Sequence, residues 1–362
     1  MAEIDRYAPH DRPAIDQMYR RVFGPDAADA NKLRWEWQYL RNPNAPGTPT
    51  IWIAREAGTV VGQYATMPVR LQAGGREICA SWGMDVMVAP ERQRQGLGEV
   101  LFRTWDENVG ASLGLGLSEA SHQLFKKLRW PDVGPVACLV KPLTRRAVRR
   151  PTWPMPINRL VSAVSLPFIR LVARSRPVEG DIQTTRRFDD GFNALWQTIA
   201  PKFDLAVRRD AAYLNWKYSE PPHVRYNIVV LRGTAALRDR TPASSTGTAV
   251  RVPRGYAVYR HAREPRGRVT LLVDFLTDPD DIEGFRALLR WIDAEAREAD
   301  SDKIRVFAMH AGFRRILRKA GYFQVKSTME FVAKINAIPA DKTFYDNRDR
   351  WHVTLGDSDQ DR

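Results

Sequence analysis

The fold is decided by the stretch Val88-Ala-Pro-Glu-Arg-Gln-Arg-Gln-Gly-Leu-Gly-Glu-Val-Leu-Phe102, which joins an apolar strand to an apolar helix. The run before it, Trp82 to Val88, has the length of a buried strand, and Pro90 ends that strand. A helix is predicted to begin near Gly96 to Gly98, because apolar residues then recur at helical spacing, at Val100, Leu101, Trp105 and Val109. A helix start offers unpaired N–H groups and a positive dipole end, and glycines let a diphosphate come close. The loop is therefore expected to bind an anion.

The spacing of the glycines narrows the class of anion. The loop lacks the Gly-Lys-Ser/Thr of a Walker loop and the three glycines of a dinucleotide-binding loop. It reads Gln93-Arg94-Gln95-Gly96-Leu97-Gly98 after Val88-x-Pro90, and this resembles the Q/R-x-x-G-x-G/A signature of the GNAT superfamily of N-acetyltransferases. The resemblance implies that these residues hold the diphosphate of acetyl-coenzyme A. The alternative is an ordinary strand-to-helix turn with capping glycines.

Composition sets the class of protein. With 362 residues, 44% hydrophobic and 27% charged, the chain fits a soluble globular protein of two domains. Two cysteines form no disulfide framework or metal quartet, and we find no signal peptide or spanning apolar run, so we expect a cytoplasmic protein without metal. The net charge of +14 favours an anionic partner: a phosphorylated substrate, nucleic acid or a membrane surface. Nucleic acid fits least, because the basic residues lack aromatic interleaving or a recognition helix.

The order of predicted elements agrees with the resemblance. The first half reads as strand 4–7, helices 14–23 and 32–40, strands 50–54, 60–67, 69–71 and 78–88, the loop and its helix, strand 112–117, helix 118–128 and strand 136–141. The GNAT fold has the same order. The predicted fold class is therefore α/β (α+β), a mixed, mostly antiparallel twisted sheet flanked by helices.

The resemblance also implies where the rest of the donor binds. In the family, the strands before and after the loop's helix splay apart, and the pantetheine arm enters the gap. Met87 and Val88 would then offer backbone hydrogen bonds to the arm, with Gly114 and Gly116 across the gap. Alternatively, these glycines only allow close helix packing.

The family's catalytic acid is missing. Where the resemblance places an Asn and a Tyr in the next helix, this chain has Ser118 and Phe125. The family tyrosine protonates the departing thiolate of coenzyme A, and phenylalanine has no proton to give. Ser121 and His122 are the candidate acids, alongside water.

The attacking amine must also lose a proton, so a carboxylate is expected near the gap. Asp85 lies within the apolar strand that precedes the loop, and Glu119 lies at the end of the strand after the loop's helix. Both are candidate bases. The alternative for each is an ion pair with one of the many arginines.

Composition changes after residue 143. From Lys141 to Arg176 there is no Asp or Glu, and apolar residues recur at helical spacing between residues 157 and 174. A basic amphipathic helix of this kind can lie on a membrane surface, which would make the protein peripheral to the membrane. The favoured alternative is a linker helix, residues 144–180, whose apolar face packs on the protein itself.

The second half repeats the first faintly. Its best match is Trp216-Lys-Tyr218, which parallels Trp37-Gln-Tyr39. Where the first half has its glycine loop, the second has Thr277-Asp-Pro-Asp-Asp-Ile-Glu-Gly284, whose carboxylates repel a diphosphate. We therefore expect four segments: a GNAT domain with the acyl-CoA loop (1–143), the linker, a degenerate GNAT-like domain (181–336) and a tail (337–362).

Two functions from different classes follow. In the first, a tandem GNAT protein, of the type found among bacterial polysaccharide biosynthesis genes, transfers an acyl group from acyl-CoA to an amine. The acceptor is small or sugar-like and can be anionic, and the second domain shapes part of its site. The alternatives are an aminoacyl-tRNA-dependent amino-acid transferase of the peptidoglycan type, or a non-catalytic protein that binds nucleic acid or membrane.

Overall fold

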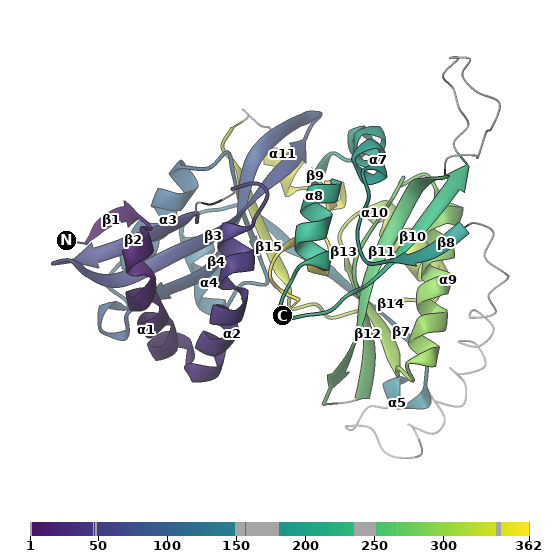
Figure 1. The fold of residues 1–362 in the computed structure, drawn as a ribbon, viewed down its shortest axis with the longest axis horizontal. Coiled ribbons are helices and arrows are strands. Elements are labelled where there is room, and N and C mark those ends of the chain that lie inside the picture. Colours follow the sequence, from purple (N-terminus) through teal and green to yellow (C-terminus); the bar gives the residue numbers. More distant parts are fainter. Residues whose placement is uncertain are drawn as a thin grey trace. The chain divides into compact units, whose positions relative to one another are not determined.

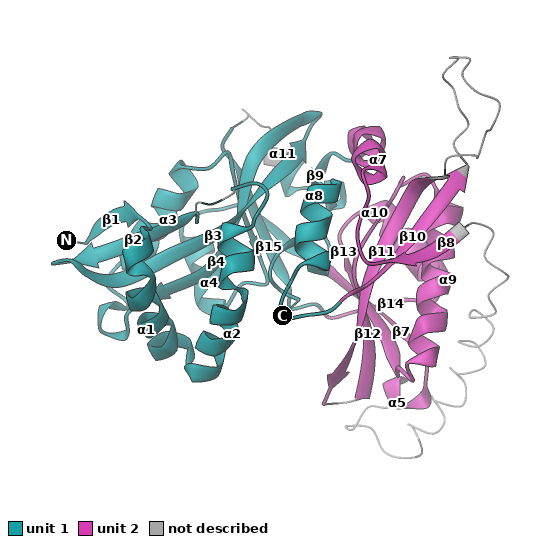
Figure 2. Cartoon of the chain, viewed as in Figure 1, with its two compact units in different colours: residues 1–136, 203–225, 327–362 teal, residues 137–202, 226–326 magenta. Residues whose placement is uncertain are grey.

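The computed structural model describes residues 2–148, 156, 181–234, 251–337 and 342–361, except positions 46, 48 and 266. The chain forms two compact units (Figure 2). The first comprises Met1–Val136, Phe203–Arg225 and Ser327–Arg362, and the second comprises Ala137–Lys202 and Tyr226–Lys326. The amphipathic segment 157–174, expected to lie on a membrane or on the protein, falls outside the described residues. Among the described residues, no helix is both long and apolar enough to cross a bilayer.

The described part of the first unit is built on one mixed sheet (Figure 1). Its strands are β1 (Glu3–Arg6), β2 (Ile51–Glu56), β3 (Thr59–Ala73), β4 (Arg76–Val88), β5 (Ala111–Leu115), β6 (Asp132–Pro135), β9 (Leu205–Val207), β15 (Glu330–Ile335) and β16 (Trp351–His352). Its helices are α1 (Arg12–Phe23), α2 (Pro25–Trp35), α3 (Leu97–Glu107), α4 (Glu119–Lys127), α8 (Ala211–Leu214) and α11 (Lys342–Asp346). The strand order is β1-β2-β3-β4-β5-β15-β6, and β9 pairs with both β3 and β16. Most pairs are antiparallel, whereas β4 runs parallel to β5.

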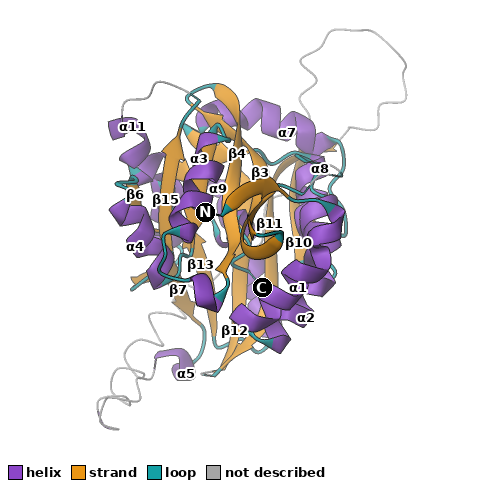
Figure 3. Cartoon of the chain, turned by 90° about the vertical axis from the view of Figure 1, so that its left-hand side faces the viewer, coloured by secondary structure: helices purple, strands orange, loops and turns teal. Residues whose placement is uncertain are grey.

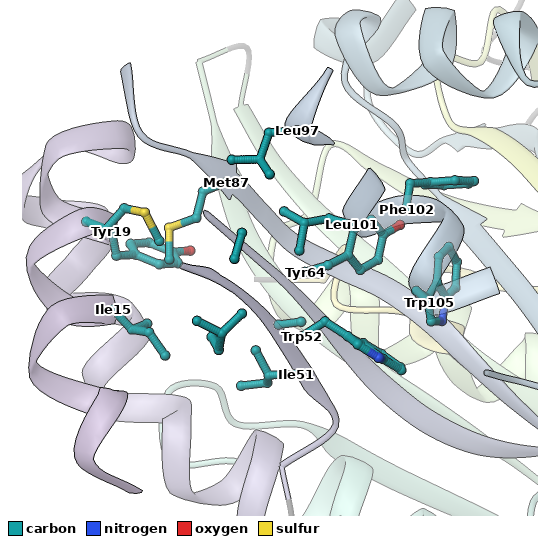
Figure 4. Close-up of a cluster of buried hydrophobic side chains, with 14 of the residues drawn as sticks. Ile15, Tyr19, Ile51, Trp52, Tyr64, Met87, Leu97, Leu101, Phe102 and Trp105 are labelled. Carbon is teal, nitrogen blue, oxygen red and sulfur yellow. The ribbon is translucent and has the colours of Figure 1, made fainter. Parts of the chain in front are cut away.

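Apolar side chains bury both faces of this sheet. Helices α1 and α2 cover one face, and α3 and α4 cover the other (Figure 3). Of the residues predicted to share one side of α3, Leu101 and Trp105 are buried, whereas Val100 is 47% exposed. Leu97 and Phe102 join Leu101 and Trp105 in the core (Figure 4). Burying each large apolar side chain stabilises the fold by about 1.5–3 kcal/mol, so this face fixes α3, and with it the preceding loop, on the sheet.

Strands β4 and β5 part beyond a short paired stretch. They pair only from Ala80 with Ala111 to Trp82 with Leu113. Beyond that point β4 follows β3, with a register shift next to Asp85, while Leu115 of β5 pairs with β15. Asp85 has a φ of 39°, a left-handed value that marks a bulge in β4. The predicted gap between these strands is therefore confirmed.

The second unit has a sheet of the same kind. Its described strands are β7 (Ala137–Pro142), β8 (Asp181–Thr185), β10 (Asn227–Thr234), β11 (Arg251–Glu264), β12 (Gly267–Thr277), β13 (Lys303–Ala308) and β14 (Phe323–Val325). Its described helices are α5 (Arg145–Val148), α7 (Gly191–Ile199), α9 (Ile282–Glu298) and α10 (Ala311–Lys319). The order is β14-β7-β13-β12-β11-β10-β8, with β12 and β13 parallel. Helix α9 follows β12 as α3 follows β4.

Two strands differ from expectation in the sheet they join. The sequence suggests that 136–141 closes the first domain, yet β7 pairs with β13 and β14 in the second unit. Conversely, β15, from the end of the second half, pairs with β5 and β6 in the first unit. A strand's own pattern shows that it is a strand and not which edge it joins. The compact units therefore differ from the contiguous ranges 1–143 and 181–336.

The internal match found in the sequence has a structural counterpart within the first unit. Trp37 and Trp216 each lie in a π-helical turn, Glu36–Leu40 and Asn215–Ser219. Their rings stack with centroids 5.1 Å apart. Each indole N–H donates to the other tryptophan's carbonyl oxygen, at 2.6 and 2.8 Å.

Candidate active site

The loop before α3 has the backbone of an anion-binding turn. Arg94 and Gly96 have φ values of 61° and 83°, and Gly96 is the N-cap of the helix. The Gln93 side chain donates to the Val88 carbonyl oxygen (3.1 Å), and the Gln95 side chain donates to the Glu91 carbonyl oxygen (2.9 Å). These bonds hold the loop to its own backbone. Residues 93 to 96 are exposed, so the start of the helix is accessible.

The acidic residue in the first turn of α3 is neutralised. Glu99 accepts from Lys127 at 2.7 Å and from Arg103 at 2.9 Å. The hydrogen bond from Lys127, and then that from Arg103, lower the pKa of Glu99, which keeps it ionised and paired. With Arg94 exposed in the loop, the surroundings of the helix start can accept a negative ligand.

A cavity of about 360 Å³ lies where β4 and β5 part. It is lined by both strand edges (Gly83–Val86 and Gly114–Ser118), by Tyr19, Phe23 and Ala27, by Tyr64, by Ser121 and Phe125 of α4, and by Asp359 and Gln360. Gly114 and Gly116, expected to border the gap, do so. At Gly114, an added Cβ would lie 2.9 Å from Val332 and 3.3 Å from Phe125, so the glycine also allows close packing.

Asp85, a predicted base, lines the cavity and is also the centre of a buried polar cluster. Its carboxylate accepts from Tyr39 (2.6 Å), Tyr19 (3.0 Å), Asn31 (3.3 Å) and Gln38 (3.4 Å), and Arg34 lies 3.5 Å away. The Asp85 side chain is 3% exposed and that of Arg34 is 6% exposed. Burial, and then the charge of Asp85, raise the pKa of Tyr39 well above its usual value, so its hydroxyl stays a donor. These contacts connect Asp85, at the bulge of β4, to α1, α2 and the π-helical turn Glu36–Leu40.

Glu119 and His122, predicted as base and acid, point to other partners. Glu119 is exposed in the first turn of α4 and accepts from Gln123 at 2.7 Å. His122 lies 3.1 Å from Asp132, and these two together with Glu330 bring one ligand atom each within 4.8 Å of the others. Neither Glu119 nor His122 is among the described residues that line the cavity. The absence of metal stays a prediction.

Ser118, Ser121 and Phe125 do lie at the cavity. Ser118 is the N-cap of α4, and its hydroxyl accepts from the Ser121 N–H and donates to the Ser121 oxygen at 2.9 Å. The hydroxyl hydrogen of Ser121 can therefore point elsewhere. Phe125 is buried against Phe102 and Trp130, with ring centroids 4.6 and 4.8 Å away. The position of the family tyrosine is thus filled by a ring without a hydroxyl.

The tail contributes residues that the sequence did not identify as site residues. Asp359 and Gln360 line the cavity, and an added Cβ at Gly116 (φ 64°) would lie 2.1 Å from the Gln360 side chain. The tail is anchored by the buried pair Arg209–Asp357 at 2.8 Å and by Lys217, which donates to the Ser358 carbonyl oxygen at 2.6 Å. The run Asp357-Ser-Asp-Gln-Asp361 has the composition of a solvated terminus, so its sequence does not predict that this segment is buried.

The acidic loop of the second unit caps its own helix. Asp281 is the N-cap of α9 and accepts from the Gly284 N–H at 3.0 Å, while Asp278 and Asp280 pair with Lys202 at 2.6 and 3.0 Å. An added Cβ at Gly284 would lie 2.3 Å from the Asp281 carboxylate. The start of α9 is therefore occupied by the chain's own carboxylate.

The geometry of the first unit agrees with comparisons to known proteins. Residues 3–114 match the family model described as an acetyltransferase (GNAT) domain. No curated protein matches the chain. The chain carries a GNAT-like mixed α/β fold, as predicted, with two mostly antiparallel sheets flanked by helices.

Solved structures share this fold over more than nine-tenths of the chain. A GCN5-related N-acetyltransferase from Anabaena variabilis is 12% identical with a TM-score of 0.61, covering 93% of this chain and 73% of that one. A probable N-acyltransferase from Enterococcus faecalis is 14% identical with a TM-score of 0.59, covering 93% and 72%. Saccharomyces cerevisiae N-myristoyltransferase with bound myristoyl-CoA is 11% identical with a TM-score of 0.52, covering 92% and 82%. At these identities the likeness concerns the GNAT fold alone.

Proposed function

We propose that the protein is an acyl-CoA-dependent N-acyltransferase that uses acetyl-CoA and acylates an amine. The observation that carries the proposal is the pairing of an exposed, glycine-containing helix start with a cavity between two parallel strands that part. The match of residues 3–114 to a GNAT acetyltransferase domain supports it. The acceptor is a small or sugar-like amine that can carry negative charge.

The donor would be held by the loop and by the edge of β4. Backbone N–H groups of Gln93 to Gly98 would bind the diphosphate, since the first turn of α3 offers donors and a positive dipole end. The pantetheine arm would run between the parted strands. Of its two predicted backbone partners, Met87 is paired with Gln63 of β3. The backbone of Val88 faces away from β3, and its carbonyl accepts from the Gln93 side chain.

The chemistry needs the amine to arrive neutral beside the thioester. The lone pair of the amine forms the C–N bond, and the electron pair of the C–S bond leaves with sulfur. One proton is lost from the nitrogen and one is taken up by the sulfur, so the step balances. Placing the amine and thioester together supplies much of the rate enhancement. Of the predicted bases, Asp85 lines the cavity but is engaged by Arg34, whereas Glu119 lies outside it. Of the predicted acids, Ser121 borders the cavity.

We expect one donor site per chain. In the second unit, the carboxylate of Asp281 occupies the start of α9 that would have to receive a diphosphate. Two nearby carboxylates, Asp278 and Asp280, would repel it further. The second unit is therefore proposed to be a degenerate GNAT-like copy without its own acyl-CoA.

Calorimetric titration with acetyl-CoA and with free coenzyme A tests the proposal. The native protein should bind one equivalent. Gly96→Ala should abolish or weaken binding, and Gly58→Ala is the matched control. Both glycines have left-handed backbones, with φ values of 83° and 78°, and neither has an atom within 4 Å of an added Cβ. Both variants thus carry similar strain, and only one touches the loop. No binding by the native protein, or equal binding by both variants, would refute the site.

Once binding is shown, a panel of amines should be assayed by release of free thiol. Amino sugars, amino acids and polyamines cover neutral, anionic and cationic acceptors. A thiol release that depends on the amine identifies an N-acyltransferase. A protein that binds coenzyme A and acylates none of these amines would instead fit a non-catalytic role.

A further inference from the structure

Tyr64 is a buried tyrosine that the sequence did not single out. It lies on β3, is 3% exposed and lines the cavity. Its ring stacks on Trp105 of α3, with centroids 4.8 Å apart, and meets Phe102 edge-on at 5.8 Å. Packing therefore holds the ring in one orientation.

The hydroxyl of Tyr64 lies where β4 and β5 part. A Cβ added to Gly83 would lie 2.5 Å from the Tyr64 Oη. Gly83 directly follows Trp82, the last residue of β4 that pairs with β5. The absence of a side chain at Gly83 is thus what lets the hydroxyl reach the backbone of β4 at the opening of the gap.

Within the described residues, no hydrogen bond to the Tyr64 hydroxyl is formed. The Tyr64 hydroxyl is not one of the fully buried polar atoms without a partner in this part of the chain, so it is open to the cavity, where a ligand can pair with it. Burial, and then the charge of Asp106, raise the pKa of Tyr64 well above its usual value. The group is therefore a protonated donor at neutral pH. It borders a cavity in which Phe125 has no hydroxyl to offer.

We propose that the Tyr64 hydroxyl donates a hydrogen bond to the sulfur of bound coenzyme A and protonates it when the C–S bond breaks. This rests on the proposed function. As the tetrahedral intermediate collapses, the C–S electron pair leaves with sulfur, which takes the Tyr64 proton and becomes the free thiol. The tyrosinate recovers a proton from the new amide nitrogen, directly or through water. No further reactant is needed.

Ser121 is the alternative donor, and it differs from Tyr64 in acidity. An alcohol is a weaker acid than a phenol, so proton transfer to a thiolate is less favourable from Ser121. Because Ser118 donates to the Ser121 oxygen, the hydroxyl hydrogen of Ser121 is not used in that bond and can also be donated to the ligand. Ser121 therefore serves as the internal comparison in the test.

The test is an ultraviolet titration of the thiol of coenzyme A bound to the native protein and to variants. A donor on the sulfur stabilises the thiolate, so the bound thiol should have a lower pKa than free coenzyme A. Tyr64→Phe should raise the pKa of the bound thiol by about 1 unit or more, the size of one hydrogen bond to a charged group. Ser121→Ala and Tyr7→Phe, the latter outside the cavity, should leave this pKa unchanged.

Thermal unfolding without ligand separates this role from a structural one. Tyr64→Phe keeps the ring and removes only an unpaired hydroxyl, so its Tm should be unchanged or higher. Should Tyr64→Phe not fold, Gly83→Ala provides a second variant, because its Cβ displaces the hydroxyl. It should raise the pKa of the bound thiol in the same way.

The outcomes separate the two proposals. A bound thiol whose pKa is the same in Tyr64→Phe and native protein overturns the role of Tyr64 and leaves the donor site standing. A shift in Ser121→Ala with none in Tyr64→Phe assigns the proton to Ser121 instead. If the native protein binds no coenzyme A, the proposed function fails, and the role of Tyr64 fails with it.

Discussion

Replacing Gly98 by alanine should separate ligand binding from folding. Gly98 is the second residue of α3, and an added Cβ would meet only the Val88 side chain, at 4.0 Å, which is an ordinary contact. Its backbone is not left-handed, so alanine fits without strain. Because glycine is the poorer helix former, the unliganded variant should be as stable as the native protein, or more stable by up to about 1 kcal/mol.

The same methyl group stands where a diphosphate would approach the backbone. A hydrogen bond to a charged group contributes about 1.5–3 kcal/mol, so losing one such bond should weaken binding roughly 10- to 150-fold. Calorimetry measures the affinity for coenzyme A, and thermal unfolding without ligand measures stability. Affinity should fall, while stability should stay the same or rise.

This difference makes the prediction refutable. If Gly98→Ala binds coenzyme A as tightly as the native protein does, no phosphate approaches this backbone, and the start of α3 is not the site. If affinity and stability fall together, the variant has damaged the helix, and the packing around Val88 has been misjudged. Weaker binding by a variant that is as stable as the native protein would place the diphosphate at the start of α3.

Three further predictions concern carboxylates. Asp85→Asn should lower the free energy of unfolding by about 3–5 kcal/mol, because it removes the carboxylate that faces the buried Arg34; an unchanged midpoint in urea would contradict this. If the cavity carboxylate of Asp359 faces the acceptor's ammonium group, Asp359→Asn should raise the KM for the amine about tenfold or more. The affinity for coenzyme A should be unchanged. Steady-state kinetics measures the KM, and calorimetry measures the affinity. Asp281→Ala should lower the free energy of unfolding by about 1 kcal/mol through loss of the α9 cap, and should leave the binding stoichiometry at one, which calorimetry measures.

The sequence predicted the elements whose signals are local. Helical spacing identified Leu101 and Trp105 as buried side chains of α3, but it wrongly grouped the exposed Val100 with them. The bounds predicted for β4 agree closely with Arg76–Val88. The loop was found because its glycines follow the spacing of the GNAT signature, and Gly96 proves to have a left-handed backbone, which glycine adopts readily. Strand and helix order then gave the fold class. Each of these inferences depends on neighbours a few residues apart.

Long-range pairing escaped the sequence. Nothing in the pattern of β7 or β15 indicates which sheet each joins. The partners of Asp85 come from α1, α2 and the π-helical turn that follows. From the sequence, Asp85 is a lone acidic residue in a strand and therefore a candidate base. The sequence does not show that it is also the centre of a buried cluster. The tail was missed for the same reason, since its anchors Arg209 and Lys217 lie more than a hundred residues away in the chain.

The glycines around the cavity show why the site could be located before its chemistry could be assigned. A glycine in a strand indicates that some atom comes close, without naming it. At Gly83 that atom is the Tyr64 hydroxyl, at Gly116 it is the Gln360 side chain, and at Gly114 the nearest atoms belong to Val332 and Leu117. Two of the three glycines thus make room for polar groups from distant segments. The Tyr64 hydroxyl and the Gln360 side chain are also groups that can bind or protonate a ligand. The chemistry of the cavity therefore depends on contacts between segments that the local sequence does not encode.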